Sequence, residues 1–204
     1  LADFLEDKRG RFPRFYFVSD PNLLENLSQG SNPALIIPHL QAVFAGIVSF
    51  DFTDKGIHAI SSSTGEGIAL LDSVPFSGNI EDWLGTIETE MQRSLKALCE
   101  TAAAKCSGPN LRDFVDTTCG QFSLLGIQFN WTAQCQEALE KCKSSKQIMT
   151  ENNKQQLAVL NELSSRCLQD LGSKMNRTKV ETLVTIHVHQ RDVTNDLTRV
   201  YKER

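Results

Sequence analysis

The sequence predicts a mainly α-helical protein: an elongated antiparallel helical bundle with a small β-hairpin or three-stranded insertion near residues 47–72. Two observations predict this fold class. From residue 79 to the end, apolar side chains recur at three- and four-residue spacing, which is typical of amphipathic helices. Between residues 47 and 72 the pattern consists of short β-rich runs separated by turn residues. Long helices joined by short loops favour a bundle, which suits a lever or spacer better than a binding pocket.

The first twenty residues combine a charged run, residues 6–9, with an aromatic cluster, residues 12–18. The cluster is too apolar for a solvent-exposed loop, and Pro13 favours an extended conformation at the residue before it. We therefore predict a short buried strand or extended segment here, with Phe15 and Phe17 in the core.

Two short helices are predicted next. Ser19 or Asp20 can cap a helix that has a proline in its first turn, and Gly30 can end that helix. A second helical segment runs from about residue 32 to Gly46, because its apolar residues lie three or four positions apart.

The following three runs favour β-strands. They are rich in β-branched and apolar residues and are separated by Gly-containing turns at residues 54–56 and 64–67. We predict a small antiparallel sheet or hairpin whose strands cover residues 47–52, 56–61 and 67–71.

Four long helical segments make up the rest of the chain. Asn79 is a predicted cap of the first segment, and the breaking sequence at residues 107–109 ends it. Gly120 and Gly126 are candidate points of bending in the second segment, and Gly172 is a candidate stop after the third. The predicted segments are residues 79–105, 111–143, 146–171 and 177–201.

The change of pattern predicts two subdomains, residues 1–78 and residues 79–204. The first holds the aromatic segment, the short helices and the strands, and the second holds the long helices. The large apolar side chains that we expect to set the stiffness of the core are Phe15, Phe17, Trp83, Leu84, Met91, Phe122 and Trp131.

Composition excludes several classes of function. The formal net charge is −4, so no overall positive field favours nucleic acid or anionic lipid. No apolar run approaches the roughly 18 residues that a membrane span needs. The six cysteines fall mainly at apolar positions of predicted helices, which favours reduced thiols in a core over a disulfide framework.

A search for catalytic motifs finds no nucleotide-binding loop and no catalytic residues. The nearest Gly-rich stretch, residues 63–67, lacks the phosphate-binding lysine and is interpreted as a hairpin turn. His187 and His189 are the best candidates for a metal site. On a helix, residues two apart point roughly 200° away from each other, so the pair cannot easily bind one ion, whereas on a strand it could. We favour one packed and one solvated imidazole.

Five motifs occur in a characteristic order along the chain. They are Phe-Pro-Arg-Phe-Tyr-Phe at residues 12–17, Leu-Leu-Glu at 23–25, Gly-Asn-Ile-Glu-Asp-Trp-Leu at 78–84, Trp-Thr at 131–132 and Val-His-Gln-Arg-Asp-Val at 188–193. Together they resemble the linker region of dynein heavy chains. The sequence departs from this family before the Trp-Thr motif, where the family often carries Trp-Pro-x-Gln and this sequence has no proline in residues 115–121.

The resemblance implies a mechanical role. The dynein linker is a helical arm over a ring of AAA+ modules, and this chain would be its C-terminal part, joined just after Arg204 to the first module. ATP and Mg would belong to the parent motor, with no cofactor in this segment. The implied partners are the AAA+ ring of the same heavy chain, other dynein chains and, through the motor, microtubules. The wording of residues 17–21 favours the axonemal type, and so a ciliary or flagellar location.

Within this resemblance, His189, Arg191 and Asp192 are the candidate contacts with the AAA+ ring. The strands near residues 47–72, an insertion between helices, are a candidate contact with the ring or with a neighbouring subunit. Two alternatives stay open at this point. One is a helical interaction scaffold unrelated to a motor, and the other is an enzyme with a metal site at His187 and His189.

Overall fold

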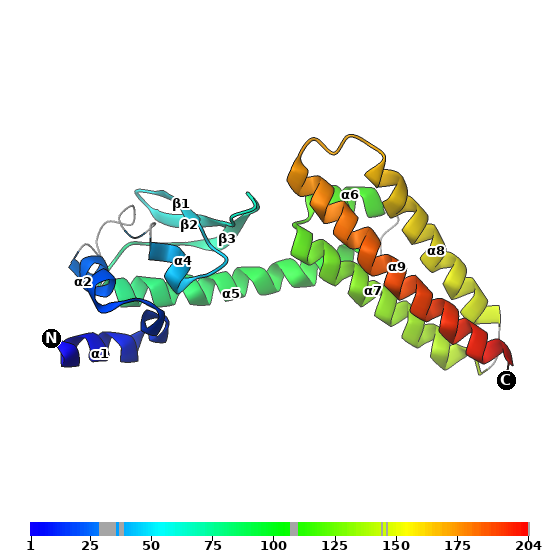
Figure 1. The fold of residues 1–204 in the computed structure, drawn as a ribbon, viewed down its shortest axis with the longest axis horizontal. Helices are drawn as coiled ribbons and strands as arrows, with labels where there is room; N and C mark the ends of the chain where they lie inside the picture. Colours follow the sequence, from blue (N-terminus) through cyan, green and yellow to red (C-terminus); the bar gives the residue numbers. More distant parts are fainter. Residues whose placement is uncertain (29–35, 37–38, 107–109, 144, 146, 204) are drawn as a thin grey trace. The chain divides into compact units, whose positions relative to one another are not determined.

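A computed structural model describes residues 1–28, 36, 39–106, 110–143, 145 and 147–203 of the chain (Figure 1). In this part the protein is mostly α-helical with one three-stranded antiparallel sheet, which confirms the predicted fold class. The expected stops at Gly30 and at residues 107–109, and the start of the second short helix near residue 32, lie outside the described residues. None of the described helices is long and apolar enough to cross a lipid bilayer.

The chain forms two compact units, Leu1–Ala97 and Leu98–Arg204. The border falls inside helix α5, Ile80–Lys105, because the first turns of this helix pack within the first unit. The subdomains predicted from the sequence instead meet at the start of this helix, and their assignment to parts of a linker stays a prediction.

The first unit begins with helix α1, Ala2–Arg11, which the sequence analysis did not predict. Its single buried residue is Leu5, so this mostly charged helix has no wide apolar stripe for a pattern search to find. Helix α2, Asp20–Ser28, follows close to its predicted position.

The aromatic cluster forms a 3₁₀-helix, η1, over Pro13–Phe17, and the predicted strand is therefore wrong. Phe12 is extended before the proline, as expected, but the chain then turns with a period of three residues. This period turns Phe12, Phe15 and Val18 toward the core. Phe17 would share a face with Phe15 on a strand, but here it is 77% exposed, so its predicted place in the core is wrong.

The sheet contains β1, Ser49–Thr53, β2, Gly56–Ser61, and β3, Gly67–Val74, in the order β1-β2-β3 with antiparallel pairing. Gly56 has a φ of +123°, and a Cβ atom there would lie 2.3 Å from the carbonyl oxygen of Val74. Only glycine fits this position, which explains the turn between β1 and β2.

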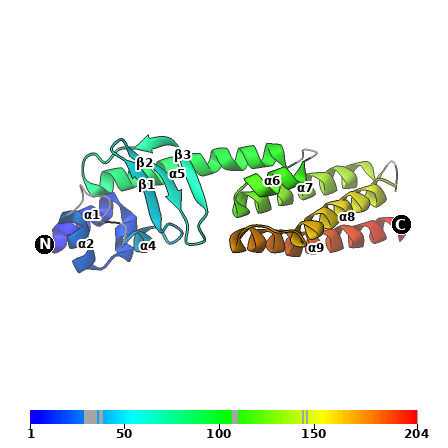
Figure 2. The same cartoon turned by 90° about the horizontal axis from the view of Figure 1, so that it is seen from above.

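Helix α5 covers the free edge of β3 (Figure 2). The backbone N–H of Leu71 donates to Ser94 Oγ at 3.0 Å, and that of Asp72 donates to Glu90 Oε1 at 2.8 Å. The hydrogen bonds that Glu90 accepts lower its pKa from the ordinary value. The bond from the Arg93 side chain has the largest effect, and the bond from the Asp72 backbone has a smaller one. These two N–H groups of β3 are therefore already paired and cannot bond to a strand of another molecule, which would otherwise favour edge-to-edge association.

The apolar face of α5 fills the core of the first unit. Trp83 and Leu84 are buried there, and Met91 is half-buried against the same cluster. The Trp83 ring meets Phe76 edge-on at 5.5 Å between ring centroids. Salt bridges from Lys8 to Glu81 and from Arg14 to Glu88 attach α1 and η1 to α5.

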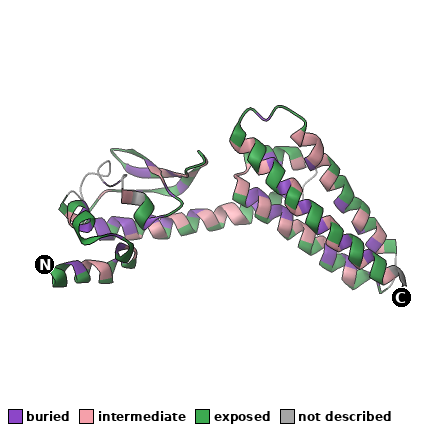
Figure 3. Cartoon of the chain, in the orientation of Figure 1, coloured by how far each residue is buried: buried purple, intermediate pink, exposed green. Residues whose placement is uncertain are grey.

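The second unit contains helices α6, α7, α8 and α9. In Figures 1 and 2, α7, α8 and α9 run alternately up and down as an antiparallel set. Their buried residues recur along the helix faces that meet one another (Figure 3). The bounds of the four helices are Leu111–Thr117, Gly120–Lys141, Gln147–Cys167 and Lys174–Glu203.

The single helical segment predicted for residues 111–143 is in fact two helices. Cys119 has an extended ψ of 151°, which separates α6 from α7 directly before Gly120. Gly126 lies inside an uninterrupted α7, so it is not a point of interruption. Helix α8 ends at Cys167, and Gly172, with a φ of +69°, belongs to the loop that precedes α9.

Gly126 allows close packing inside the second unit. A Cβ atom at this position would lie 2.7 Å from Cζ of the buried Phe114 and 3.1 Å from Cβ of Cys106. Gly85, in the middle of α5, has no heavy atom within 4 Å of the equivalent position. Close packing therefore requires a glycine at position 126, whereas no neighbouring atom requires one at position 85.

We expect Gly126→Ala to lower the free energy of unfolding by about 1–3 kcal/mol, because the added methyl group overpacks the buried contact with Phe114. Gly85→Ala should raise the free energy of unfolding by about 0.5–1 kcal/mol, because alanine restricts the unfolded chain and meets open space. Urea unfolding followed by circular dichroism measures both. Equal stability of the two variants would contradict the proposed role of Gly126.

Candidate functional site: a buried polar network

The inward face of α9 changes from apolar to polar along its length. Val180 and Leu183 are buried first, at the spacing expected of a helix in a bundle. The next inward positions are also at most 3% exposed, but they carry His187, Gln190, Thr194 and Thr198. Buried polar groups need hydrogen-bond partners, so this half of α9 must find them on its neighbours.

His187 connects α9 to α8. Its Nε2 lies 3.0 Å from the backbone carbonyl oxygen of Gln156, and its Nδ1 lies 2.9 Å from Oε1 of Gln190. The carbonyl oxygen of Gln156 can only accept, so Nε2 is the donor, and in the neutral ring Nδ1 accepts from the Gln190 amide when its NH₂ group is turned toward the ring. Burial lowers the pKa of His187 from its ordinary value and favours the neutral ring, although the two hydrogen bonds oppose part of this effect.

Gln156 extends the connection from α8 to α7. Its Nε2 donates to Oε1 of Gln134 at 2.7 Å and to Oδ1 of Asn152 at 3.2 Å. Asn152 in turn donates to Sγ of Cys135 at 3.4 Å, and this sulfur lies 3.5 Å from Oγ1 of Thr194. Hydrogen bonds therefore link all three long helices of the second unit.

Thr194 has a second partner on α7. The indole N–H of Trp131 donates to Thr194 Oγ1 at 3.0 Å, and the same hydroxyl donates to the backbone carbonyl of Gln190 at 2.9 Å. One turn further on, the hydroxyl of Thr198 lies 2.8 Å from the backbone carbonyl oxygen of Thr194 and 3.2 Å from that of Met149 on α8, so its single hydrogen is shared between the two acceptors. We call the following set the buried polar network: Gln134, Asn152, Gln156, His187, Gln190, Thr194 and Thr198.

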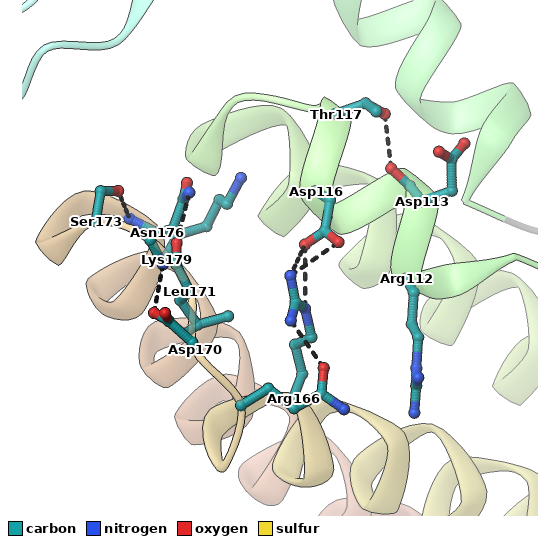
Figure 4. Close-up of polar contacts among 12 residues, drawn as sticks. Arg112, Asp113, Asp116, Thr117, Arg166, Asp170, Leu171, Ser173, Asn176 and Lys179 are labelled. Carbon is teal, nitrogen blue, oxygen red and sulfur yellow. Dashed lines mark hydrogen bonds and ion pairs between the residues drawn. The ribbon is translucent and has the colours of Figure 1, made fainter.

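Charged and polar contacts close one end of the same unit (Figure 4). Arg166 on α8 forms a bidentate ion pair with Asp116 on α6, with its Nη2 2.9 Å from each carboxylate oxygen. Nζ of Lys179 on α9 donates to the backbone carbonyl of Thr118 at 3.1 Å. That carbonyl lies at the break between α6 and α7, so the lysine satisfies a backbone group left there.

This arrangement fixes its side chains in place by hydrogen bonds between neighbouring helices. A cavity of about 180 Å³ lies beside the network and is lined in part by Trp131, Gln156 and His187. In the described part of the chain, no group of three His, Cys, Asp or Glu side chains converges as a metal site would require. Residues 63–66 lie between β2 and β3, and Gly67 begins β3, which agrees with the predicted hairpin turn.

The structure places the sequence-predicted site residues on α9, outside the network. His189 and Asp192 are exposed and Arg191 is half-buried, with Arg191 Nη1 3.3 Å from Asp192 Oδ1. Because His187 is buried and His189 is exposed, the two histidines do not converge on one point. A role of these residues in contact with a ring stays a prediction.

Sequence reasoning missed most of the network, although a signal was present. It expected one packed and one solvated imidazole in the pair His187 and His189, without assigning which, and did not single out the threonines and glutamines that follow. These residues continue the three- and four-residue spacing of Val180 and Leu183, so a search for polar residues at inward positions could have found them. Of the predicted core residues in this unit, Phe122 is buried and Trp131 is half-buried.

Comparison with known proteins identifies the family. The family described as "Dynein heavy chain, N-terminal region 2" matches residues 1–102 of the 204 residues. Dynein axonemal heavy chain 5 of Rattus norvegicus is 45% identical over 206 residues, which cover 98% of this chain and 6% of the relative. Dynein axonemal heavy chain 8 of Homo sapiens is 43% identical over 206 residues, covering 98% of this chain and 5% of the relative.

A more distant relative is similar over the same range. The dynein gamma chain of the flagellar outer arm of Chlamydomonas reinhardtii is 36% identical over 203 residues, covering 98% of this chain and 4% of the relative. The chain thus spans only about a twentieth of the length of these relatives, from 4% to 6%. With half of its residues matched to the family's N-terminal region, the chain belongs to the dynein heavy chain family.

Proposed function

We propose that this chain is a non-catalytic mechanical segment of an axonemal dynein heavy chain, in the C-terminal part of its linker. It would transmit the ATP-driven conformational change of the AAA+ ring into minus-end-directed movement along microtubules. The observation that carries the proposal is the buried polar network. A lever must keep its helices in one register under load, and directional hydrogen bonds between named positions stabilise a single register.

The family supports the remaining parts of this proposal. The printed names of the relatives include axonemal heavy chains and a flagellar outer-arm chain, which supports a location in the axoneme of a cilium or flagellum. ATP and Mg would bind in other parts of the motor. The partners would be the AAA+ ring of the same chain, other dynein chains and, through the motor, microtubules. A helical scaffold unrelated to a motor has no support from this family.

The network contributes to rigidity because displacement of one helix leaves buried donors without acceptors. If α9 slid along α7, the indole N–H of Trp131 would lose Thr194, and if it slid along α8, the Nε2–H of His187 would lose the carbonyl of Gln156. Each buried group left unsatisfied costs about 1–3 kcal/mol, so the cost of sliding grows with every member of the network.

We expect Thr194→Val to lower the free energy of unfolding by about 1–3 kcal/mol, because it keeps the shape of the side chain but leaves the Trp131 N–H unpaired. The matched control is Thr182→Val on the exposed side of α9. Its hydroxyl also donates to the carbonyl four residues earlier, at 2.8 Å, and should change stability by less than about 0.5 kcal/mol.

In the full-length heavy chain, Thr194→Val should reduce microtubule gliding velocity while ATP turnover continues, because a less rigid arm transmits less of the ring's motion. Thr182→Val should leave both quantities unchanged. Gliding assays and phosphate-release assays on the same preparations measure the two. If Thr194→Val destabilised the unit but left velocity per ATP hydrolysed intact, rigidity of this network would not be needed for coupling.

Arg191→Glu tests the predicted contact with the ring. We expect the charge reversal to lower gliding velocity per ATP hydrolysed, because it removes a positive group from the proposed interface. Arg199→Glu is the control, since Arg199 is an exposed arginine on the same helix with its own partner, Asp196, at 3.3 Å. Identical coupling in the two variants would place the contact elsewhere.

The lowered pKa of His187 predicts a pH dependence of stability. The unfolded chain, with an ordinary pKa near 6.5, binds a proton at pH values where the folded protein keeps this ring neutral. The contribution of the neutral His187 ring to the free energy of unfolding is therefore complete above pH 6.5. It is lost as the pH falls toward the lowered pKa of this ring in the folded state. Urea unfolding at several pH values should show a flatter dependence for His187→Gln than for the parent chain.

The exposed His189 provides the control for this measurement. His189→Gln should keep the steeper pH dependence of the parent chain, because the substitution leaves the buried ring in place. Equal slopes for His187→Gln and the parent chain would show that burial of His187 does not control this part of the stability curve.

A further inference from the structure

The exposed side of α7 is unusual for a solvent-facing helix. The 17 residues 120–136 contain no charged side chain, in a chain that is 23% charged. The neighbouring helices behave differently, because α8 exposes Glu151 and Lys154, and α9 exposes Glu181 and Arg199. Depletion of charged residues together with an exposed aromatic side chain is the compositional mark of an interface core.

The exposed residues of this stretch form one continuous stripe. They recur at three- and four-residue spacing, which places them on the same face of the helix. Phe129 is 60% exposed and Leu125, one turn before it, is 41% exposed. We call this stripe the uncharged face: the exposed Leu125, Phe129, Thr132, Ala133 and Gln136, together with the half-buried Gln128.

A groove lies beside the uncharged face within the second unit. It has a volume of about 420 Å³ and lies between α7 and the last turns of α5, where Cys99 and Ala103 form its other wall. Among the residues that the structure describes, no charged residue lines this groove. A groove between two helices can accept a row of side chains from a third helix.

We propose that the uncharged face is covered, in the intact heavy chain, by an apolar helix from another part of the same heavy chain, outside these 204 residues. The absence of charge determines the chemistry of this partner. A charged group brought against the face would be desolvated without a counter-charge, whereas apolar side chains gain from burial. The partner helix therefore presents uncharged, apolar side chains at three- and four-residue spacing.

The small size of the face favours a tethered partner over a second copy of the chain. The stripe from Leu125 to Gln136 is about 18 Å long at 1.5 Å per residue, and a stable complex of separate proteins buries about 800 Å² on each side. A helix in the same polypeptide has a high effective concentration and needs less contact area. The relatives are long enough to supply one, because this chain spans only 4% to 6% of their length.

Photo-crosslinking in the full-length heavy chain tests the proposal, which rests on the proposed function only in placing this chain within such a protein. The variant Phe129→p-benzoylphenylalanine keeps an aromatic ring on the face. After irradiation and mass spectrometry, the expected product is a cross-link to one helix of the same heavy chain outside these 204 residues, through an uncharged surface. Leu168, which is 91% exposed in the loop after α8, is the control position and should give no defined product.

Thiol labelling measures how completely the face is covered. Thr132→Cys and Thr182→Cys replace the same residue type on α7 and α9, and both positions are exposed in the structure. In the full-length heavy chain, Thr132→Cys should react with a maleimide at least about tenfold more slowly than Thr182→Cys. A tenfold difference corresponds to a face that is open about a tenth of the time.

Three results would overturn the proposal: equal labelling rates at the two positions, cross-links from Phe129 only to other polypeptides, or cross-links only within these 204 residues. None of these results would affect the coupling measurements on Thr194 and Arg191. Failure of this inference is therefore distinguishable from failure of the proposed mechanical function.

Discussion

The second unit depends on one physical constraint, which is that polar side chains removed from water need partners in the interior. Along the last half of α9, that constraint is met by hydrogen bonds to two other helices, one donated by His187 to the carbonyl of Gln156 and one donated by Trp131 to Thr194. An apolar core tolerates small shifts between helices, because dispersion contacts are not directional. A core that contains these bonds has one arrangement in which every donor is satisfied, so specificity of packing and resistance to sliding have the same origin.

The first unit achieves stability by different means. Its core cluster is apolar, the buried Glu81 is paired with Lys8, and Arg14 meets Glu88 closer to the surface. Glu90 and Ser94 accept hydrogen bonds from the free edge of β3, so the sheet is attached to α5 through its backbone. Helix α5 is thus both the main apolar wall of this unit and the partner of the sheet edge.

Much of this fold was readable from the sequence wherever apolar periodicity and turn chemistry agreed. The three strands and α5 fall close to their predicted positions, because glycines mark the turns and the stripe through Trp83 and Leu84 is regular. The prediction of a strand at residues 12–18 was wrong, because this segment forms the 3₁₀-helix η1. Its period of three residues turns Phe15 inward and leaves Phe17 exposed, whereas a strand would place both on one face. Sequence reasoning also missed the break before Gly120, which depends on the backbone at Cys119, and α1, whose buried surface is a single leucine.

The candidate site was less predictable than the fold, because buried polar residues resemble surface residues in a one-dimensional pattern. Gln156 is next to another glutamine, and only packing shows which of the two lies inside. The threonines at 194 and 198 were hidden for the same reason. A rule that continues the inward spacing of Leu183 into polar sequence would separate them from their solvated neighbours.

The distribution of the two tryptophans offers a practical consequence. Trp83 lies in the core of the first unit, edge-on to Phe76, and Trp131 lies in the second unit with its indole N–H on Thr194. Each unit therefore contains its own intrinsic fluorophore, in a distinct environment. A chain with a single indole, made by replacing one tryptophan with phenylalanine, would report by its emission spectrum on one half of the molecule while the other remained optically silent.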